Sequence, residues 1–186
     1  MNRELSEAGI VVEEAQIESI FAEWRQALGA EYAGYRGHVY RVFNCCLRLR
    51  DCDADERRKL AIALVFHDIG LWSARTLDYL PPSEAEAVAW LARNGLAAWS
   101  DEIAMMIRMH HRIRHWRDPA TPLVETLRRA DLIDFSLGAY SGGLPRAFLR
   151  ELSAAIPNAG FHRFLLRAGF GWFLRHPLRP TPFLRW

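Results

Sequence analysis

The chain has 186 residues, of which 51% are hydrophobic, and 24 Lys and Arg residues against 22 Asp and Glu residues leave a net charge of +2. This length fits one domain with a sizeable apolar core, and the small net charge gives no support for a nucleic-acid partner. No stretch approaches the roughly 18 uninterrupted apolar residues of a membrane-spanning helix, so we expect no transmembrane segment.

Two features favour a cytoplasmic location. The N-terminal stretch MNRELSEAGIVVEEAQ is acidic and has no long apolar run, so we expect no secretory signal. Cys45, Cys46 and Cys52 form an odd, clustered set, which is a poor disulfide framework. We therefore expect reduced thiols in a reducing compartment.

Apolar residues recur at helical spacing along nearly the whole chain, and alternating strand patterns are scarce. The spacing predicts a first helix over Glu13–Leu28. A turn through Gly34 and Gly37 is then expected to precede a second helix, which carries His38 on its apolar face.

The next segment combines a helix cap with a proline pair. Asp53 or Asp55 is suited to cap a third helix, which we expect to end near Gly70. The segment 78–83 contains two consecutive prolines, so we predict a loop there, with Ser83 as the cap of the following helix.

Three further breaks divide the second half of the chain. Asn94-Gly95 is expected to end the helix after the proline pair, Ser100 or Asp101 to open the next one, and Thr121-Pro122 to start another, with proline in the favoured first turn.

The C-terminal part, residues 140–186, is expected to hold two helices and a tail. Gly142-Gly143 breaks the chain before predicted helices over Leu144–Ala155 and Ala159–Leu174, and the proline-rich tail HPLRPTPFLRW is expected to be extended. The sequence therefore predicts one all-α domain over residues 1–186, a helical bundle of about seven or eight helices.

Four metal-binding residue types fall on faces that the periodicity assigns to the core, namely His38, His67, Asp68 and Asp131. A buried carboxylate is costly unless it is paired or bound to a metal. Two imidazoles and two carboxylates leave coordination positions open and suit a divalent cation such as Mn, Fe, Ni, Co, Mg or Zn. Taken singly, each His has a simpler interpretation as a core histidine, and His67-Asp68 as the cap at the end of a helix.

The ordered set of these residues resembles a known family signature. His38, the HDIG stretch at residues 67–70, and Asp131 in RRADLIDF look like the H…HD…D signature of the HD superfamily of metal-dependent phosphohydrolases. The resemblance spans roughly residues 35–134. It implies an HD-type helical bundle with a divalent metal at its centre. It also implies an enzyme that hydrolyses a phosphorylated small molecule or nucleotide through a metal-activated water.

The sequence departs from the two-metal members of that family at one place. Those members typically carry an extra histidine at the start of the helix after the HD loop, where this chain has Ser83 and Glu84. His110 and His111 could instead complete a second site, with Asp68 as a bridge, and we predict a catalytic role for these three. Alternatively, one of the two histidines packs in the core and the other is exposed, since helix neighbours point about 100° apart.

Phosphate ester hydrolysis also needs positive charge near the substrate. Arg41 lies one helical turn after the first predicted metal-binding histidine, and Arg114 and His115 follow the histidine pair in HHRIRHW. We predict that these three bind an anionic substrate, although a solvated basic loop is the simpler explanation for either of the latter two. Glu84 and Asp78 are possible general bases.

The resemblance leaves the reaction open, because the same scaffold hosts several activities. Members that cleave cyclic dinucleotides carry a lysine after HDIG and a GYP motif, whereas this chain has Leu71 and no GYP. One alternative is a di-iron oxygenase or a metal-dependent hydratase that uses the histidine pair. The other is a non-catalytic module that binds a metal or an anion.

The C-terminal segment is basic and aromatic, with Glu151 as the only acid from Tyr140 onward. Contact with a membrane surface, an anionic ligand or a second subunit in a homodimer would explain this composition. The interpretation we prefer is structural packing, in which a last helix and tail lie over the bundle with their arginines outward. The residues expected to pack there are Phe164, Leu165, Phe173 and Trp186.

Overall fold

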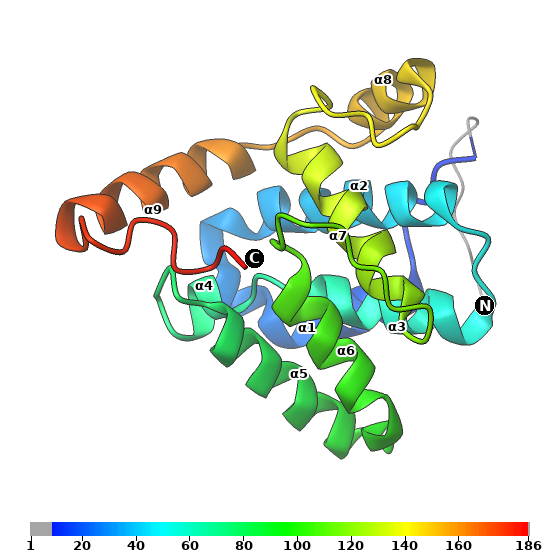
Figure 1. Cartoon of the computed structure of the whole chain (residues 1–186), viewed down its shortest axis with the longest axis horizontal. Helices are drawn as coiled ribbons and strands as arrows, with labels where there is room; N and C mark the ends of the chain where they lie inside the picture. Colours follow the sequence, from blue (N-terminus) through cyan, green and yellow to red (C-terminus); the bar gives the residue numbers. More distant parts are fainter. Residues whose placement is uncertain (1–8, 186) are drawn as a thin grey trace.

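The computed structural model describes residues 9–185, and within this range the chain is helical and has no β-strand (Figure 1). The α-helices are α1 (Ala15–Leu28), α2 (Tyr32–Leu49), α3 (Ala54–Phe66), α4 (Gly70–Ser73), α5 (Leu80–Arg93), α6 (Ser100–Met109), α7 (Pro122–Phe135), α8 (Arg146–Ala155) and α9 (Phe161–Arg175). Two 3-10 helices, η1 (Gly29–Glu31) and η2 (Ala97–Trp99), precede α2 and α6. The all-helical prediction is confirmed: in the described range eight helices have ten or more residues, and α4 is a single turn.

The centre of the bundle is formed by α2, α3 and α7. Helix α2 packs most extensively against α7, while α3 lies among α1, α2 and α6 (Figure 1). Every residue from Leu60 to Phe66 in α3 is buried, which is the pattern of a helix enclosed on all sides. The stretch that follows α3 therefore starts deep inside the molecule.

Both ends of α3 are defined by local chemistry. At its start, the Asp53 carboxylate accepts a hydrogen bond of 2.8 Å from the Glu56 N–H, and the Glu56 carboxylate accepts one from the Asp53 N–H. This is a capping box, and it confirms Asp53 as the predicted cap. After Phe66, the HDIG stretch turns tightly into α4, with the Ile69 N–H bonded to the Phe66 carbonyl at 3.1 Å.

The turn predicted at Gly34 and Gly37 is wrong, because both glycines lie inside α2. Their role is close packing against the loop between α8 and α9. A Cβ atom at Gly34 would lie 3.2 Å from the carbonyl oxygen of Ala159, and one at Gly37 would lie 3.1 Å from that of Pro157. The glycines thus let this loop backbone approach α2, which a local sequence pattern cannot reveal.

The loop predicted over residues 78–83 is also too long, since α5 already begins at Leu80. Pro81 and Pro82 occupy its first turn, where a backbone N–H would have no helical partner. Ser83 is not the helix cap. It is buried, and its hydroxyl accepts a hydrogen bond of 2.9 Å from the Gly70 N–H, which ties α5 to the HDIG turn.

The C-terminal region follows the predicted order of elements. The chain breaks at Gly142-Gly143, where both residues have positive φ, and then forms α8 and α9. The tail does not run straight. It makes turns and comes back to the loop after α6, where the Arg185 carbonyl accepts a hydrogen bond of 2.9 Å from the Ile113 N–H (Figure 1). Two predictions concern residues outside the described range: the absence of a secretory signal, which involves residues 1–8, and the packing of Trp186.

Two predictions about the whole chain can be compared with this fold. No helix among residues 9–185 is long and apolar enough to cross a membrane. Cys45, Cys46 and Cys52 form no disulfide in the described residues.

Gly70 gives a test of the packing between the HDIG turn and α5. A Cβ atom at this position would overlap the carbonyl oxygen of Tyr79, so Gly70→Ala should lower the free energy of unfolding by about 2 kcal/mol or more in urea denaturation. Gly169→Ala in α9 is the control, since a Cβ there meets nothing within 4 Å and alanine favours a helix. Equal stability of Gly70→Ala and the unmodified chain would contradict the packing described.

Candidate metal centre

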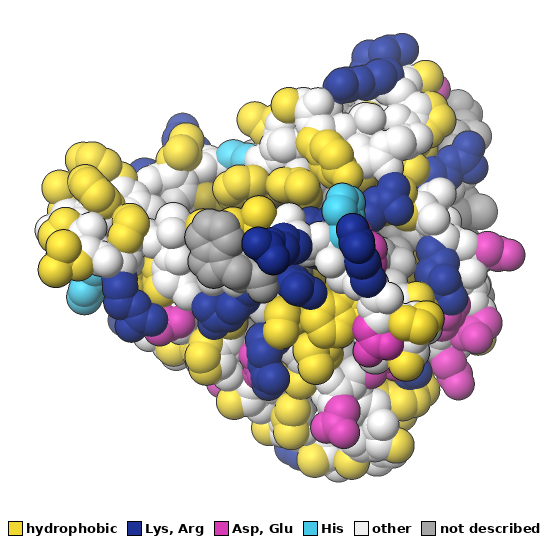
Figure 2. Space-filling view, in the orientation of Figure 1, with side chains coloured by type: hydrophobic (Ala, Val, Ile, Leu, Met, Phe, Trp, Pro, Cys, Tyr) yellow, Lys and Arg dark blue, Asp and Glu magenta, His cyan; other side chains and the backbone are white. Residues whose placement is uncertain are grey.

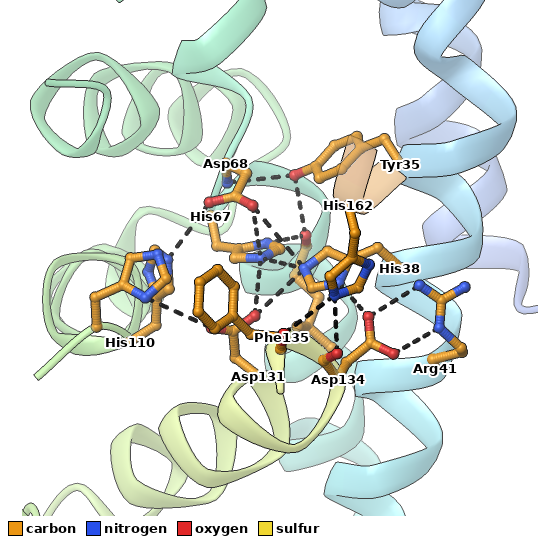
Figure 3. Close-up of polar contacts among 12 residues, drawn as sticks. Tyr35, His38, Arg41, His67, Asp68, His110, Asp131, Asp134, Phe135 and His162 are labelled. Atoms are coloured by element: carbon orange, nitrogen blue, oxygen red, sulfur yellow. Dashed lines mark hydrogen bonds and ion pairs between the residues drawn. The ribbon is translucent and has the colours of Figure 1, made fainter. Parts of the chain in front are cut away.

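The four residues predicted to bind metal come together at the centre of the bundle (Figure 3). His38 comes from α2, His67 and Asp68 from the turn after α3, and Asp131 from α7, and all four are buried. His38 Nε2 lies 3.0 Å from His67 Nε2 and 3.3 Å from Asp131 Oδ1. His67 Nε2 lies 3.4 Å from Asp68 Oδ2. Four potential ligand atoms therefore point at one another.

The outer nitrogens of the two histidines identify the tautomers. His67 Nδ1 lies 2.6 Å from the Leu64 carbonyl oxygen, which can only accept, so Nδ1 carries the proton. His38 Nδ1 lies 2.7 Å from Asp134 Oδ2 and is likewise the donor to a carboxylate. In their neutral forms both rings then present a lone pair on Nε2 to the centre of the cluster. Lone pairs facing each other and facing carboxylates call for a cation between them.

In the absence of a bound metal, the pKa shifts of the cluster describe protonated imidazole beside ionised carboxylates. Burial raises the pKa of Asp131, but hydrogen bonds from His38 and His67 outweigh this and hold the pKa well below its usual range. Burial likewise raises the pKa of Asp68, and the charges of His67 and His110 more than reverse it. Burial lowers the pKa of His38, yet its bonds to Asp131 and Asp134 raise it to about 9. In this state imidazole protons supply the positive charge beside the ionised carboxylates, and a divalent metal that displaces the Nε2 protons would supply it instead.

A second group of ligands shares Asp68 with the first. Asp68, His110 and His111 each place one ligand atom within 4.8 Å of the other two. His110 Nδ1 donates to the Ile107 carbonyl at 2.7 Å, which leaves Nε2 directed at Asp68 Oδ1, 3.4 Å away. Neither of these two buried atoms has a hydrogen-bond partner. Unsatisfied buried polar atoms are rare, and a metal between them would satisfy both.

His111 completes this second group. Its Nε2 lies 2.6 Å from the Tyr79 hydroxyl, and its Nδ1 lies 3.7 Å from Asp131 Oδ2. Burial, followed by the charge of His110, lowers the pKa of His111 to about 3, so the ring is neutral, as a metal ligand must be. Both Asp68 and Asp131 therefore offer one oxygen to His38 and His67 and the other to the histidine pair. His110 and His111 both face the cluster.

Asp134 is a residue of the candidate site that our sequence analysis missed. It lies one turn after Asp131 on α7 and receives hydrogen bonds from His38 and from Arg41, whose Nε is 2.5 Å and Nη2 2.9 Å from the carboxylate oxygens. A carboxylate behind a metal-binding histidine fixes its orientation. The sequence held one signal for this role. Arg41 follows His38 by three residues, and Asp134 follows Asp131 by three residues, so the members of each pair lie on the same helix face.

The structure does not support the substrate-binding role predicted for Arg41. Its guanidinium is buried, and its remaining donors bond to the carbonyl oxygens of Pro157 at 3.0 Å and Ile156 at 3.4 Å. Each of its three nitrogens donates to a partner inside the protein. Arg41 therefore supports the site from behind and does not face a ligand.

The other predicted substrate contacts and general bases lie away from the cluster. Arg114 and His115 are exposed on the loop after α6, and His115 bonds to Glu125 at 3.0 Å. Asp78 and Glu84 form ion pairs with arginines. None of these four residues is among those that line the pocket at the metal cluster.

That pocket has a volume of about 600 Å³ and reaches His38, Asp68, His111 and Asp131. Most of its other lining is apolar, and it includes Phe161, Leu165 and Phe173 of α9, Phe135 of α7 and Phe183 of the tail. Figure 3 shows Phe135 and His162 beside the cluster. A small molecule entering the pocket would therefore meet both groups of ligands.

Comparison with family models, curated proteins and solved structures found no match for this chain. The interpretation of the site therefore rests on its geometry and on the motif in the sequence. The resemblance to the HD superfamily stays a prediction.

Asp134 provides a test of this arrangement. Asp134→Asn keeps the shape of the side chain but weakens its bond to His38, so the affinity for Mn²⁺ or Zn²⁺ should fall by about 10–100-fold in a competition assay with a chelator. Asp51→Asn, at an exposed position between α2 and α3, is the matched control and should bind as the unmodified chain does. Unchanged affinity in a normally helical Asp134→Asn protein would show that Asp134 does not position a ligand.

Proposed function

We propose that this protein is a metal-dependent phosphohydrolase of the HD type, with divalent metal held by His38, His67, Asp68 and Asp131. The observation that supports this most strongly is a buried set of imidazoles and carboxylates, contributed by separate helices and open to a pocket. The order of these residues in the chain, H…HD…D, resembles the signature of HD phosphohydrolases, and this resemblance suggests the reaction class.

The metal would supply the central chemistry. A divalent cation lowers the pKa of a bound water from about 15.7 towards about 7 and polarises a phosphoryl oxygen. The protein holds the ligands in place: Asp134 and the Leu64 carbonyl fix the ring tautomers of His38 and His67. Tyr79 holds the His111 ring so that Nδ1 faces Asp131. The apolar wall of the pocket limits the access of bulk water.

We further propose two metal positions that share Asp68 and Asp131. The second position is supported by the unpartnered atoms Asp68 Oδ1 and His110 Nε2 and by the neutral ring of His111. Metals held by these residues would supply positive charge for the oxygens of a phosphoryl group. This gives Asp68, His110 and His111 the catalytic importance predicted from the sequence.

A di-iron oxygenase or a metal-dependent hydratase is the second candidate. The observation that favours it is the pocket lining, which includes no Arg or Lys within the described part of the chain. A phosphate in this pocket would depend on the metals alone for positive charge. The second candidate predicts two irons per chain and a coloured protein.

The proposed setting is the cytoplasm, where the three free thiols would stay reduced. The proposed partner is an anionic small molecule that reaches the metals through the pocket. A homodimer is compatible with the exposed apolar side chains of α9.

Activity against a generic phosphate ester tests the proposal. Protein loaded with Mn²⁺, Ni²⁺ or Co²⁺ should hydrolyse p-nitrophenyl phosphate, and EDTA should abolish the activity reversibly. Asp68→Asn should lower kcat by at least about 100-fold because it removes the charge shared by both metal positions. Asp51→Asn should retain full activity.

Two results would contradict the phosphohydrolase. Metal-loaded protein without turnover on a broad panel of phosphate esters would point to a non-catalytic module. Two irons per chain with substrate-dependent oxygen consumption would support the oxygenase.

A further inference from the structure

One face of α9 forms a wall of the pocket. Phe161, Leu165, Gly169 and Phe173 all line it, and they recur every four residues, so they lie on one side of the helix. Leu166 and Phe170 also line the pocket and remain largely exposed, at 75% and 65%. Figure 2 shows hydrophobic side chains gathered over the end of α9. An apolar surface therefore runs outward from the metal centre.

An adjacent face of α9 is anchored, so this wall is part of the fold. Phe164, Ala168 and Trp172 pack against a second apolar cluster, which contains Leu71 and Leu77. The Phe164 ring stacks on Trp72, with ring centroids 5.1 Å apart. This packing fixes α9 beside the pocket, and Leu71 and Leu77 of the same cluster add to the apolar lining.

The few polar side chains in the pocket already have partners. The Tyr79 hydroxyl is bonded to His111. The two ring nitrogens of His162 contact Asn158 and the carbonyl oxygen of Asp134, the latter at 3.0 Å. Apart from the metal ligands, the lining offers no charged side chain in the described residues. The hydroxyls of a sugar or the edge of a base would lose their water here without replacement, which is costly.

We infer that the substrate is a phosphate monoester of an apolar alcohol, with an alkyl or aryl body lying against α9 and the phosphate at the metals. This inference rests on the proposed function and specifies its substrate class. Water would add to phosphorus and the bond from phosphorus to the ester oxygen would break. The products would be inorganic phosphate and the apolar alcohol, which takes up the proton.

Alkylphosphonates that cannot be hydrolysed test the pocket without turnover. Their binding should be measured by calorimetry to Mn²⁺-loaded and to EDTA-treated protein. Each buried methylene should tighten binding by about threefold to fourfold, so octylphosphonate should bind at least about 30-fold more tightly than butylphosphonate. This dependence on chain length should persist without metal, while overall affinity should fall. If affinity does not fall without metal, the metal proposal fails. If affinity does not depend on chain length, the apolar pocket fails.

Two glycines of α9 give a matched pair of variants. A Cβ at Gly169, which lines the pocket, meets nothing within 4 Å, whereas Gly171 lies outside the lining and its Cβ would meet only the Arg175 side chain. Gly169→Trp should fill the pocket and weaken octylphosphonate binding by at least about tenfold. Gly171→Trp should change the affinity for octylphosphonate by no more than about twofold. Both replace a helical glycine with a better helix former, and circular dichroism checks the fold.

The same chemistry could come from a free amphiphile or from a lipid, and vesicles containing phosphatidate distinguish the two. Binding of monomeric octylphosphonate alone identifies a free amphiphile, and binding of both identifies a lipid-borne substrate. The inference is overturned if butylphosphonate and octylphosphonate bind equally, or if Gly169→Trp binds octylphosphonate as tightly as Gly171→Trp.

Discussion

The fold is organised around ionised carboxylates in an apolar interior. Asp68 and Asp131 are buried on helices and turns that are otherwise packed with aliphatic and aromatic side chains. Burying such charge is unfavourable unless counter-charge lies within contact distance. Imidazoles from α2, the HDIG turn and the end of α6 provide the contacts, so several helices have to meet at one point. A divalent cation at that point would balance the charge that the bundle encloses.

Much of this arrangement could be predicted from the sequence, because helical periodicity determines which side chains face inward. His38 and Asp131 continue apolar stripes, and His67 directly follows the apolar run LAIALVF at the end of α3. Asp134 and Arg41 could not be recognised in the same way, since a buried ion pair and a solvated one look alike in one sequence. Their roles depend on the contact between α2 and α7.

The errors in the predicted elements have a common physical origin. Gly34 and Gly37 resemble a turn locally, yet they lie in a helix because another loop must approach it closely. Ser83 resembles a cap, yet its hydroxyl bonds to Gly70 in the HDIG turn. For α9, aromatic residues occur on several faces, so the sequence did not show which face would be anchored and which would border the pocket. Contacts between distant segments decide all of these cases.

Metal content tests the central claim most directly. Elemental analysis should be performed on protein purified without added metal, on His67→Ala, and on His176→Ala as a control at an exposed position of the tail. We predict at least one divalent transition metal per chain in the unmodified protein and in His176→Ala, and its loss in His67→Ala. The account is contradicted if no preparation holds metal even after reloading, or if His67→Ala retains the full content.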